Sequence, residues 1–233
     1  MENENVIGLS QVSKTYGEGA NRITALRNAS VEFRRGEFTA VIGKSGSGKS
    51  TLLNMISGID RPTSGEITHG DNLLHDMSEN ELAIWRGRNI GMVFQFFQLI
   101  PTLTVLENLL LPMDFCGIVP SSLRRAKAER LLNRTGVARY ADSLPLFLSG
   151  GEQQRVAVAR SLVNDPAFVI ADEPTGNLDT QNARCVTALL RELSAEGKSV
   201  VMVTHNQEMA DAADRVLSIH DGEIAADTGT VAV

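Results

Sequence analysis

The sequence Gly43-Lys44-Ser45-Gly46-Ser47-Gly48-Lys49-Ser50 decides the fold, because it fits the pattern G-x-x-x-x-G-K-[ST]. An apolar run at residues 38–42 predicts a strand before it, and a helix is expected over residues 49–57. Glycines in that setting let consecutive N–H groups converge on phosphate oxygens at the positive end of the helix. The motif therefore predicts a phosphate-binding loop, which we call the phosphate loop (residues 43–50).

Two further roles follow from this motif. Lys49 is expected to reach the β- and γ-phosphates of a nucleotide, and the Ser50 hydroxyl to bind Mg²⁺. Thr51, next in the chain, is expected to line the same site. The sequence thus predicts a site for a nucleoside triphosphate with its magnesium ion.

Asp172 and Glu173 follow a short apolar run at residues 168–171 and supply the acidic element that such a site requires. Asp172 is expected to contribute to the metal shell, and Glu173 to polarise a water for attack on the γ-phosphate. Taken alone, an Asp-Glu pair after a strand is usually the start of a solvated loop. The phosphate loop favours the functional interpretation.

The remaining pattern alternates strands and helices, which predicts an α/β protein with a parallel sheet. Capping boxes at Ser78 with Glu81 and Thr104 with Glu107 predict two helix starts. The strands expected are residues 28–34, 38–42, 90–94, 168–171 and 199–204, and the helices 49–57, 104–133 with a break at 117–120, 151–163, 180–195 and 207–213. The turn at residues 35–37 predicts that strands 28–34 and 38–42 form a mixed or antiparallel edge, and Asp221-Gly222 predicts a hairpin.

One domain is expected over residues 1–233. Its nucleotide-binding core is predicted to be split between residues 1–90 and 155–233. A mainly helical insertion is expected at about residues 91–154.

Composition excludes several classes of protein. The formal charge of −6 and the pI of about 5.3 argue against a nucleic-acid partner. Cys116 and Cys185 are far apart and have no ligand-spaced neighbours, so neither a disulfide framework nor a zinc site is expected. The polar N-terminus and the lack of a long apolar run predict a chain that stays in the cytoplasm.

Residues 148–155, Leu-Ser-Gly-Gly-Glu-Gln-Gln-Arg, resemble the signature motif of the ATP-binding cassette (ABC) family. Ser149 and the glycines at 150 and 151 would form a second anion-binding nest at a helix start. The resemblance implies an α/β phosphate-loop core with an antiparallel β subdomain and an inserted helical subdomain. It also implies ATP hydrolysis by a head-to-tail homodimer, in which Ser149, Gly150, Gly151 and Glu152 contact the partner's ATP.

The resemblance extends to four further positions. Tyr16 is similar to the aromatic residue that stacks on adenine, and Gln95 to the Q-loop glutamine that contacts Mg²⁺ and the attacking water. Asp179 falls in the D-loop at the dimer interface, and His205 matches the switch histidine that hydrogen-bonds the γ-phosphate. His69, His75 and His220 have no such context and are expected at the surface or in turns.

Within the family, residues 171–179 and 101–108 are similar to ATPases of lipoprotein-releasing, macrolide-efflux and antimicrobial-peptide-resistance systems. That implies a permease with a large extracytoplasmic domain, driven from the cytoplasmic side of a bacterial inner membrane for export or mechanotransmission. Two alternatives stay open: a cell-division ATPase that regulates cell-wall hydrolases, and a DNA-repair ATPase. The second is disfavoured, because residues 49–149 contain neither heptads nor a cysteine cluster.

Four phenylalanines lie in or near the charge-free stretch at residues 90–106: Phe94, Phe96, Phe97 and Phe115. They fit either the core of the helical insertion or an apolar groove for a cytoplasmic helix of the permease.

Overall fold

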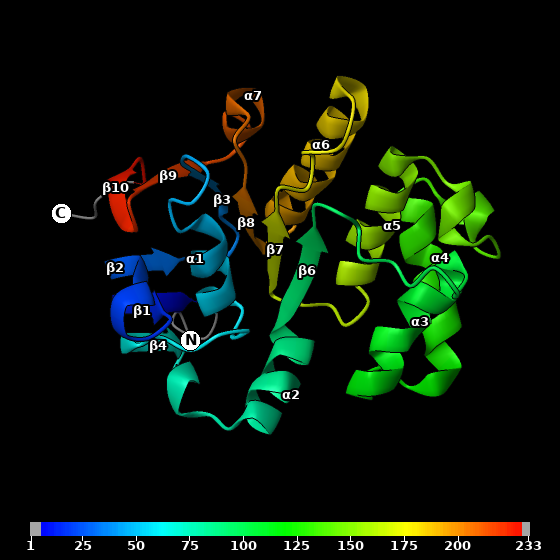
Figure 1. The fold of residues 1–233 in the computed structure, drawn as a ribbon. Helices are drawn as coiled ribbons and strands as arrows, with labels where there is room; N and C mark the ends of the chain where they lie inside the picture. Colours follow the sequence, from blue (N-terminus) through cyan, green and yellow to red (C-terminus); the bar gives the residue numbers. More distant parts are fainter. Residues whose placement is uncertain (1–5, 230–233) are drawn as a thin grey trace.

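The computed structural model describes residues 6–229 and contains two sheets (Figure 1). The larger one has the strand order β10-β9-β3-β8-β7-β6. Its parallel strands are β3 (Phe38–Ile42), β6 (Ile90–Phe94), β7 (Phe168–Asp172), β8 (Ser199–Val203) and β9 (Arg215–His220), and β10 (Glu223–Asp227) closes one edge antiparallel to β9. The hairpin expected at Asp221-Gly222 is confirmed.

The register of the parallel strands brings their carboxyl ends to one edge. Asp172 at the end of β7 is paired with Phe94 of β6 on one side and with Val203 of β8 on the other. The loops after β3, β6, β7 and β8 therefore emerge together, which is where ligands bind in open α/β sheets.

The smaller sheet is antiparallel, with the order β2-β1-β4-β5. Its strands are β1 (Ile7–Tyr16), β2 (Ile23–Phe33), β4 (Ser64–His69) and β5 (Asn72–Leu73). The expected pairing of strands 28–34 and 38–42 is wrong, because β2 and β3 belong to different sheets. Between them the chain is held by β8: Ser199 Oγ donates to the Arg34 carbonyl at 2.7 Å and Val200 N to the Glu37 carbonyl at 2.9 Å.

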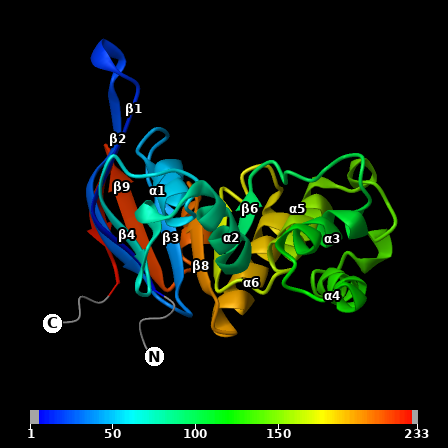
Figure 2. The same ribbon diagram turned by 90° about the horizontal axis from the view of Figure 1, so that it is seen from below.

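Seven α-helices lie within the described residues: α1 (Lys49–Ile56), α2 (Glu79–Asn89), α3 (Val105–Cys116), α4 (Ser121–Arg134), α5 (Gly150–Ser161), α6 (Thr180–Ala195) and α7 (Gln207–Ala210). Both predicted capping boxes are present, at the starts of α2 and α3. Figures 1 and 2 show α3, α4 and α5 gathered beside β6, at the end of the molecule away from the small sheet. Short 3₁₀ helices occupy Gly19–Asn21, Leu74–Asp76, Ala138–Tyr140 and Pro145–Phe147.

The two faces of the large sheet carry separate hydrophobic cores. Along β7, Phe168 and Ile170 pack with α1 and the small sheet, whereas Val169 and Ala171 pack with α3, α4, α5 and α6. This division follows from the alternation of side chains along a strand. Helix α1 and helix α5 therefore lie on opposite faces of the same sheet.

His69 lies in the core, so its expected place at the surface or in a turn is wrong. Its side chain is buried, its Nδ1 accepts a bond from Trp85 Nε1 at 3.1 Å, and its ring packs edge-on against Trp85 and Phe168. Burial lowers the pKa of His69. His75 is half-buried and its Nδ1 accepts the Ile67 N–H at 3.2 Å, whereas His220 is exposed as expected.

Arg215 joins the small sheet to the large one. Its guanidinium pairs with Asp227 of β10 at 2.6 Å and with Glu37 at 3.0 Å, and it donates to the Glu32 carbonyl of β2 at 2.7 Å. Over residues 6–229, none of the helices combines the length and apolarity needed to span a bilayer.

Candidate functional site

The phosphate loop connects β3 to α1 and closes on itself in this structure. Lys49 is buried, and its Nζ donates to the carbonyls of Gly43 and Lys44, both at 2.8 Å. Gly48 has a φ of 108°, and a Cβ there would clash with the carbonyl of Ala25. The final glycine of the motif is thus required both by its backbone conformation and by the close approach of β2.

A pocket of about 200 Å³ lies over this loop. The residues that line it are Ala25, Ser45, Gly46, Gly48, Lys49, Ser50, Thr51 and Glu173. The structure therefore brings most of the expected phosphate-binding residues together with Glu173. Ser47 lies beneath them, with its Oγ buried and without a partner among the described residues.

Asp172 ends β7 beside the start of α1. Burial raises the pKa of its carboxyl group, and the nearby charge of Glu173 acts in the same direction. A hydrogen bond with Ser50 and the charge of Lys49 oppose that shift. Asp172 and Ser50 thus place two side-chain oxygen atoms side by side, next to the first turn of α1.

Glu173 and His205 lie side by side in the wall of a second pocket of about 150 Å³. His205 Nδ1 lies 3.5 Å from Glu173 Oε2, and the imidazole is well exposed. Glu173 has a φ of 46°, a left-handed conformation that is uncommon for a side chain other than glycine. Its N–H donates to the Val203 carbonyl at 3.1 Å, which holds the strained residue in place.

Tyr16 lies at the end of β1 and is held by residues that the sequence did not single out. Its hydroxyl donates to Asp60 Oδ2 at 2.9 Å, while Lys14 Nζ binds Asp60 Oδ1 at 2.6 Å and lies 5.0 Å from the centre of the tyrosine ring. Burial, and then the bond to Asp60, raise the pKa of Tyr16. Burial alone would raise the pKa of Asp60, but the bonds from Lys14, Tyr16 and the Arg61 N–H lower it.

Gln95 begins the loop after β6, which we call the Q-loop (residues 95–98). Its amide nitrogen lies against Gly176, and its carbonyl accepts a bond from Asn177 Nδ2 at 3.2 Å. Gln95 therefore sits beside the Glu173–His205 pocket, which Gly176 helps to line. Its expected contact with Mg²⁺ and the attacking water stays a prediction.

The signature motif forms the N-terminus of α5. Ser149 caps the helix, and its Oγ donates to Glu152 Oε2 at 2.7 Å. Tyr140 Oη at 2.6 Å and Arg139 at 3.0 Å bind the other oxygen of Glu152. The hydrogen bonds from Tyr140 and Ser149 lower the pKa of Glu152 to about 2, so this side chain is a carboxylate at neutral pH.

Gly151 and Asp179 are linked through Asn182 on α6. Asp179 caps α6 by accepting the Asn182 N–H at 2.9 Å, and its other oxygen accepts Asn182 Nδ2 at 2.7 Å. A Cβ at position 151 would clash with Asn182 Oδ1, so α5 and α6 touch at this glycine. The signature motif and the D-loop thus form one packed unit, none of whose residues lines the phosphate pocket.

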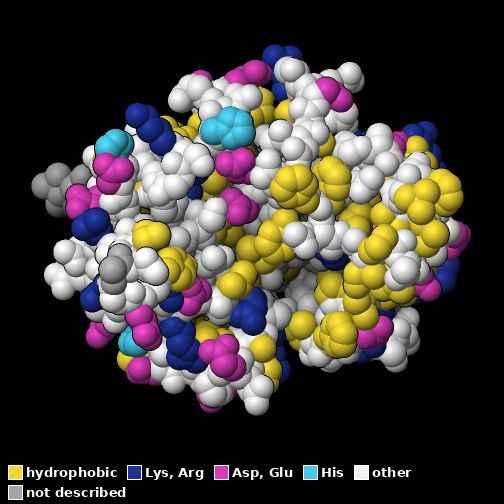
Figure 3. All heavy atoms as spheres, viewed as in Figure 1, with side chains coloured by type: hydrophobic (Ala, Val, Ile, Leu, Met, Phe, Trp, Pro, Cys, Tyr) yellow, Lys and Arg dark blue, Asp and Glu magenta, His cyan; other side chains and the backbone are white. Residues whose placement is uncertain are grey.

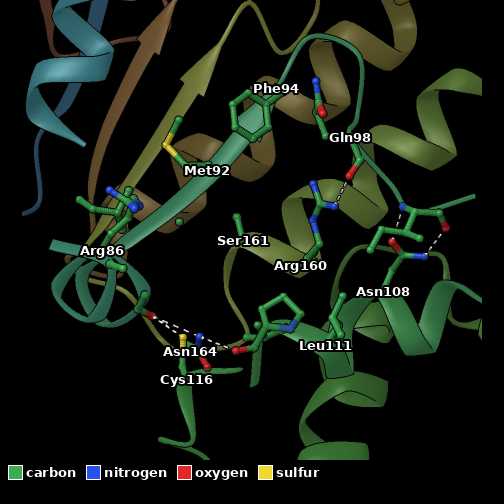
Figure 4. Close-up of a pocket in the computed structure, with 17 residues that line it drawn as sticks. Arg86, Met92, Phe94, Gln98, Asn108, Leu111, Cys116, Arg160, Ser161 and Asn164 are labelled. Atoms are coloured by element: carbon green, nitrogen blue, oxygen red, sulfur yellow. Dashed lines mark hydrogen bonds between the residues drawn. The ribbon is translucent and has the colours of Figure 1, made fainter. Parts of the chain in front are cut away.

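An apolar groove of about 390 Å³ lies between β6 and helices α2, α3 and α5, and we call it the α3–β6 groove (Figure 4). Phe94, Ile100 and Leu111 are among the side chains that line it. In Figure 3 hydrophobic side chains gather over α3, α4 and α5, beside the hollow at β6. Phe96 and Phe115 are 69% and 81% exposed, so the core interpretation is wrong for these two.

The sequence did not single out Asp60 and Asn182, which bind Tyr16 and Asp179, or Arg160, which binds the Q-loop, and it gave Gln154 no role of its own. The partners of Asp60, Gln154 and Arg160 lie far away in the chain, so no pattern of spacing indicates these contacts. Asn182 lies three residues after Asp179, a spacing typical of a helix cap. The position of Gln154 and Arg160 on the helix that starts at the signature motif was the other available signal.

Comparison with known proteins identifies the family. A family model described as ABC transporter matches residues 26–176. The lipoprotein-releasing system ATP-binding protein LolD of Saccharophagus degradans is 41% identical over 93% of this chain and 95% of its own length. The macrolide export ATP-binding/permease protein MacB of Mannheimia succiniciproducens is 41% identical over 96% of this chain, which corresponds to 35% of that longer protein.

Solved structures agree with these relatives. The dimeric structure of MJ0796, a bacterial ABC transporter cassette, has a TM-score of 0.88 and 43% identity, and the match covers 95% of this chain and 97% of that one. A post-hydrolysis state of the same cassette, bound to ADP and Pi, also gives a TM-score of 0.88. The chain described here belongs to the ABC transporter family and is an ATP-binding and ATP-hydrolysing cassette of that family.

Proposed function

We propose that this cassette is the ATPase subunit of a membrane transporter for export or mechanotransmission, of the lipoprotein, macrolide or peptide type. It would act as a homodimer at the cytoplasmic face of a bacterial inner membrane, with a permease that has a large extracytoplasmic domain. The names of the LolD and MacB relatives support this class. The division into a core of residues 1–90 and 155–233 and a helical part near 91–154 belongs to the same proposal.

The observation that carries the proposal is the separation of two anion-binding helix starts. The phosphate loop opens α1 on one face of the large sheet, whereas Ser149 opens α5 on the other. Both helix N-termini favour anions, yet the pocket lined by the phosphate loop and Glu173 contains no residue of the signature motif. A second copy, packed head to tail, would bring its Ser149 and Gly150 to the ATP held by the first copy's phosphate loop.

ATP would displace the internal bonds of Lys49. Its Nζ now donates to two carbonyls of its own loop, and the phosphates would offer a stronger, charged acceptor at the same place. Tyr16, at the edge of the site, would stack on adenine. The tether to Asp60 would fix the angle of the ring.

The donor set fits Mg²⁺. Asp172 and Ser50 are adjacent oxygen ligands, and the raised pKa of Asp172 reports a carboxylate whose charge is poorly compensated. Magnesium is commonly held by one or two protein oxygens together with phosphates, as this pair would require, and Gln95 would join them after a small movement. When bound, the ion would neutralise charge on the phosphates.

Hydrolysis would be carried out by Glu173 and His205. The Glu173 carboxylate would accept a proton from a water as the water oxygen bonds to the γ-phosphorus and the bond to the ADP oxygen breaks. His205, 3.5 Å from Glu173, would hydrogen-bond the γ-phosphate and hold the carboxylate toward the water. Products would then be ADP and inorganic phosphate.

The α3–β6 groove is the proposed contact with the permease. It is apolar along Phe94, Ile100 and Leu111 and opens beside the Q-loop, so a cytoplasmic helix seated there would lie close to Gln95.

The test is co-purification with a co-expressed permease of this class. Ile100→Glu should abolish association while leaving ATP binding intact. Ile84→Glu, at an isoleucine of α2 that is also exposed but lies outside the groove, should not. Retained association of Ile100→Glu would contradict the assignment of the groove.

A further inference from the structure

Arg160 connects α5 to the Q-loop through two backbone bonds. Its guanidinium donates to the carbonyl of Phe97 at 2.8 Å and to that of Gln98 (Figure 4). Both Arg160 and Gln98 line the α3–β6 groove. Across residues 6–229 no carboxylate forms an ion pair with Arg160, and its guanidinium is bound by the two carbonyls of the loop instead.

The backbone that Arg160 binds is strained. Phe97 and Gln98 are consecutive residues in the left-handed region, with φ values of 57° and 54°. Left-handed conformations are disfavoured for residues other than glycine, with asparagine and aspartate the best tolerated. Two consecutive left-handed residues persist only where the surrounding structure holds them in that conformation. The fork of donors on one guanidinium can bind two successive carbonyls, which an ammonium does less well.

A second side chain of α5 holds the other end of the same loop. Gln154 is fully buried, and its Nε2 donates to the Phe94 carbonyl at 3.2 Å. Gln95 is therefore bracketed by two attachments to the helix that begins with the signature motif. Asn177 adds a third bond, to the Gln95 carbonyl.

We infer that Arg160 is a positioning residue for ATP hydrolysis: by holding Phe97 and Gln98 in the left-handed conformation, it keeps Gln95 beside the Glu173–His205 pocket. Because the guanidinium also lines the groove, a protein segment bound there contacts the group that fixes the conformation of the Q-loop. The position of Gln95 therefore depends, through Arg160, on whether the groove is occupied. The inference rests on the proposed role of Gln95 in hydrolysis.

Removing the donors tests this inference. In Arg160→Met, which keeps the length of the side chain, we expect kcat for MgATP to fall about tenfold with KM changed less than about twofold. Hydrogen exchange of residues 95–100, measured by mass spectrometry without nucleotide, should become faster. In Arg160→Lys, both kcat and the exchange rate should lie between those of Arg160→Met and the native protein. Arg125→Met, which removes an exposed arginine of α4, should change neither quantity.

A rescue separates positioning from a general structural role. Gln98→Asn favours the left-handed conformation by itself, so adding it to Arg160→Met should recover part of the lost kcat and slow the exchange again. It should not rescue a variant that is merely misfolded.

Unchanged exchange of residues 95–100 in Arg160→Met would overturn the inference, and so would a lost kcat that Gln98→Asn fails to restore. Gln95→Ala tests the underlying proposal separately. If Gln95→Ala keeps its kcat, the role of Gln95 in hydrolysis fails, while the exchange measurement still decides whether Arg160 holds the loop. If Arg160→Met does not fold, the same comparison is made with Arg160→Lys.

Discussion

The carboxylate of Asp172 is half-buried beside Ser50 and Glu173, and burial raises its pKa. A carboxyl group whose pKa is higher in the folded state contributes stability below its unfolded pKa, and that stability is lost as the pH rises through the folded value. Without nucleotide, the ionised form of Asp172 is therefore less favourable to folding than the protonated form. The carboxylate expected to bind the metal therefore does not contribute to the stability of the fold.

Asp172→Asn should raise the melting temperature of the nucleotide-free protein at pH 7, since it removes the buried charge and keeps a polar partner for Ser50. The gain should shrink as the pH falls, because the native carboxyl group becomes protonated. Affinity for MgATP should fall in the same variant. Thermal unfolding between pH 7 and pH 5 checks the first two results, and a lower melting temperature for Asn at pH 7 would contradict them.

Tyr16 permits a test that separates its ring from its hydroxyl. Tyr16→Ala removes the proposed stack on adenine, worth about 1–3 kcal/mol for an aromatic–base contact, so the Kd for ATP should rise roughly 5- to 150-fold. Tyr16→Phe keeps the ring but loses the bond to Asp60, and its Kd should rise only a few fold. Calorimetry with inorganic tripolyphosphate, which has no base, should show no change for either variant; a weaker tripolyphosphate affinity would refute the assignment to adenine.

Residues that belong to a motif of fixed spacing could be predicted from the sequence to lie together. Lys49, Ser50, Asp172 and Glu173 meet because the ends of parallel strands share one edge of the sheet. The tethers of these residues could not be predicted in the same way. Asp60 meets Tyr16 across 44 positions of the chain, and only the folded arrangement of β1 and the segment after α1 brings them together.

At the scale of elements, the predicted strands and helices agree with the structure except where pairing or termination depends on distant residues. The strand at residues 90–94 and the helix at residues 180–195 have the predicted bounds, since capping and periodicity are local. The pairing of β2 could not be predicted from its neighbours in the sequence. The turn between β2 and β3 does not reveal that β2 pairs with β1 and β3 with β8. Helix α7 ends at Ala210, three residues before the predicted end.

The contact between α5 and α6 predicts whether a glycine-to-alanine substitution raises or lowers the free energy of unfolding. Replacing a helical glycine by alanine ordinarily stabilises by about 0.5–1 kcal/mol. At Gly151 the added methyl group would clash with Asn182, so Gly151→Ala should destabilise by about 1–3 kcal/mol, as overpacking does.

Gly150→Ala is the matched control, because a methyl group there would meet Phe97 and Leu178 at ordinary distances of 3.5 and 3.8 Å. Urea unfolding of the two variants checks the difference. Equal stability of the two would mean that α5 and α6 are not in the contact described.

At the scale of the whole molecule, the site is divided between two faces of one sheet. The phosphate loop and Glu173 line one pocket, and the signature motif lies apart from it with Asp179 and Asn182. The Q-loop joins the two parts, because its backbone is bound from α5 while Gln95 lies against Gly176. If the signature motif binds ATP as proposed, a single copy holds two halves of an ATP site that do not face each other, and a second copy would complete it.

Glu173→Gln tests the claim that a second copy completes the ATP site. It keeps the size of the side chain but removes the proposed base, so it should trap the ATP-bound state. Sedimentation velocity of this variant should show a monomer without nucleotide and a dimer with saturating MgATP. The double variant Glu173→Gln with Lys49→Ala should stay monomeric. Glu173→Gln that binds ATP by calorimetry yet sediments only as a monomer would contradict the claim.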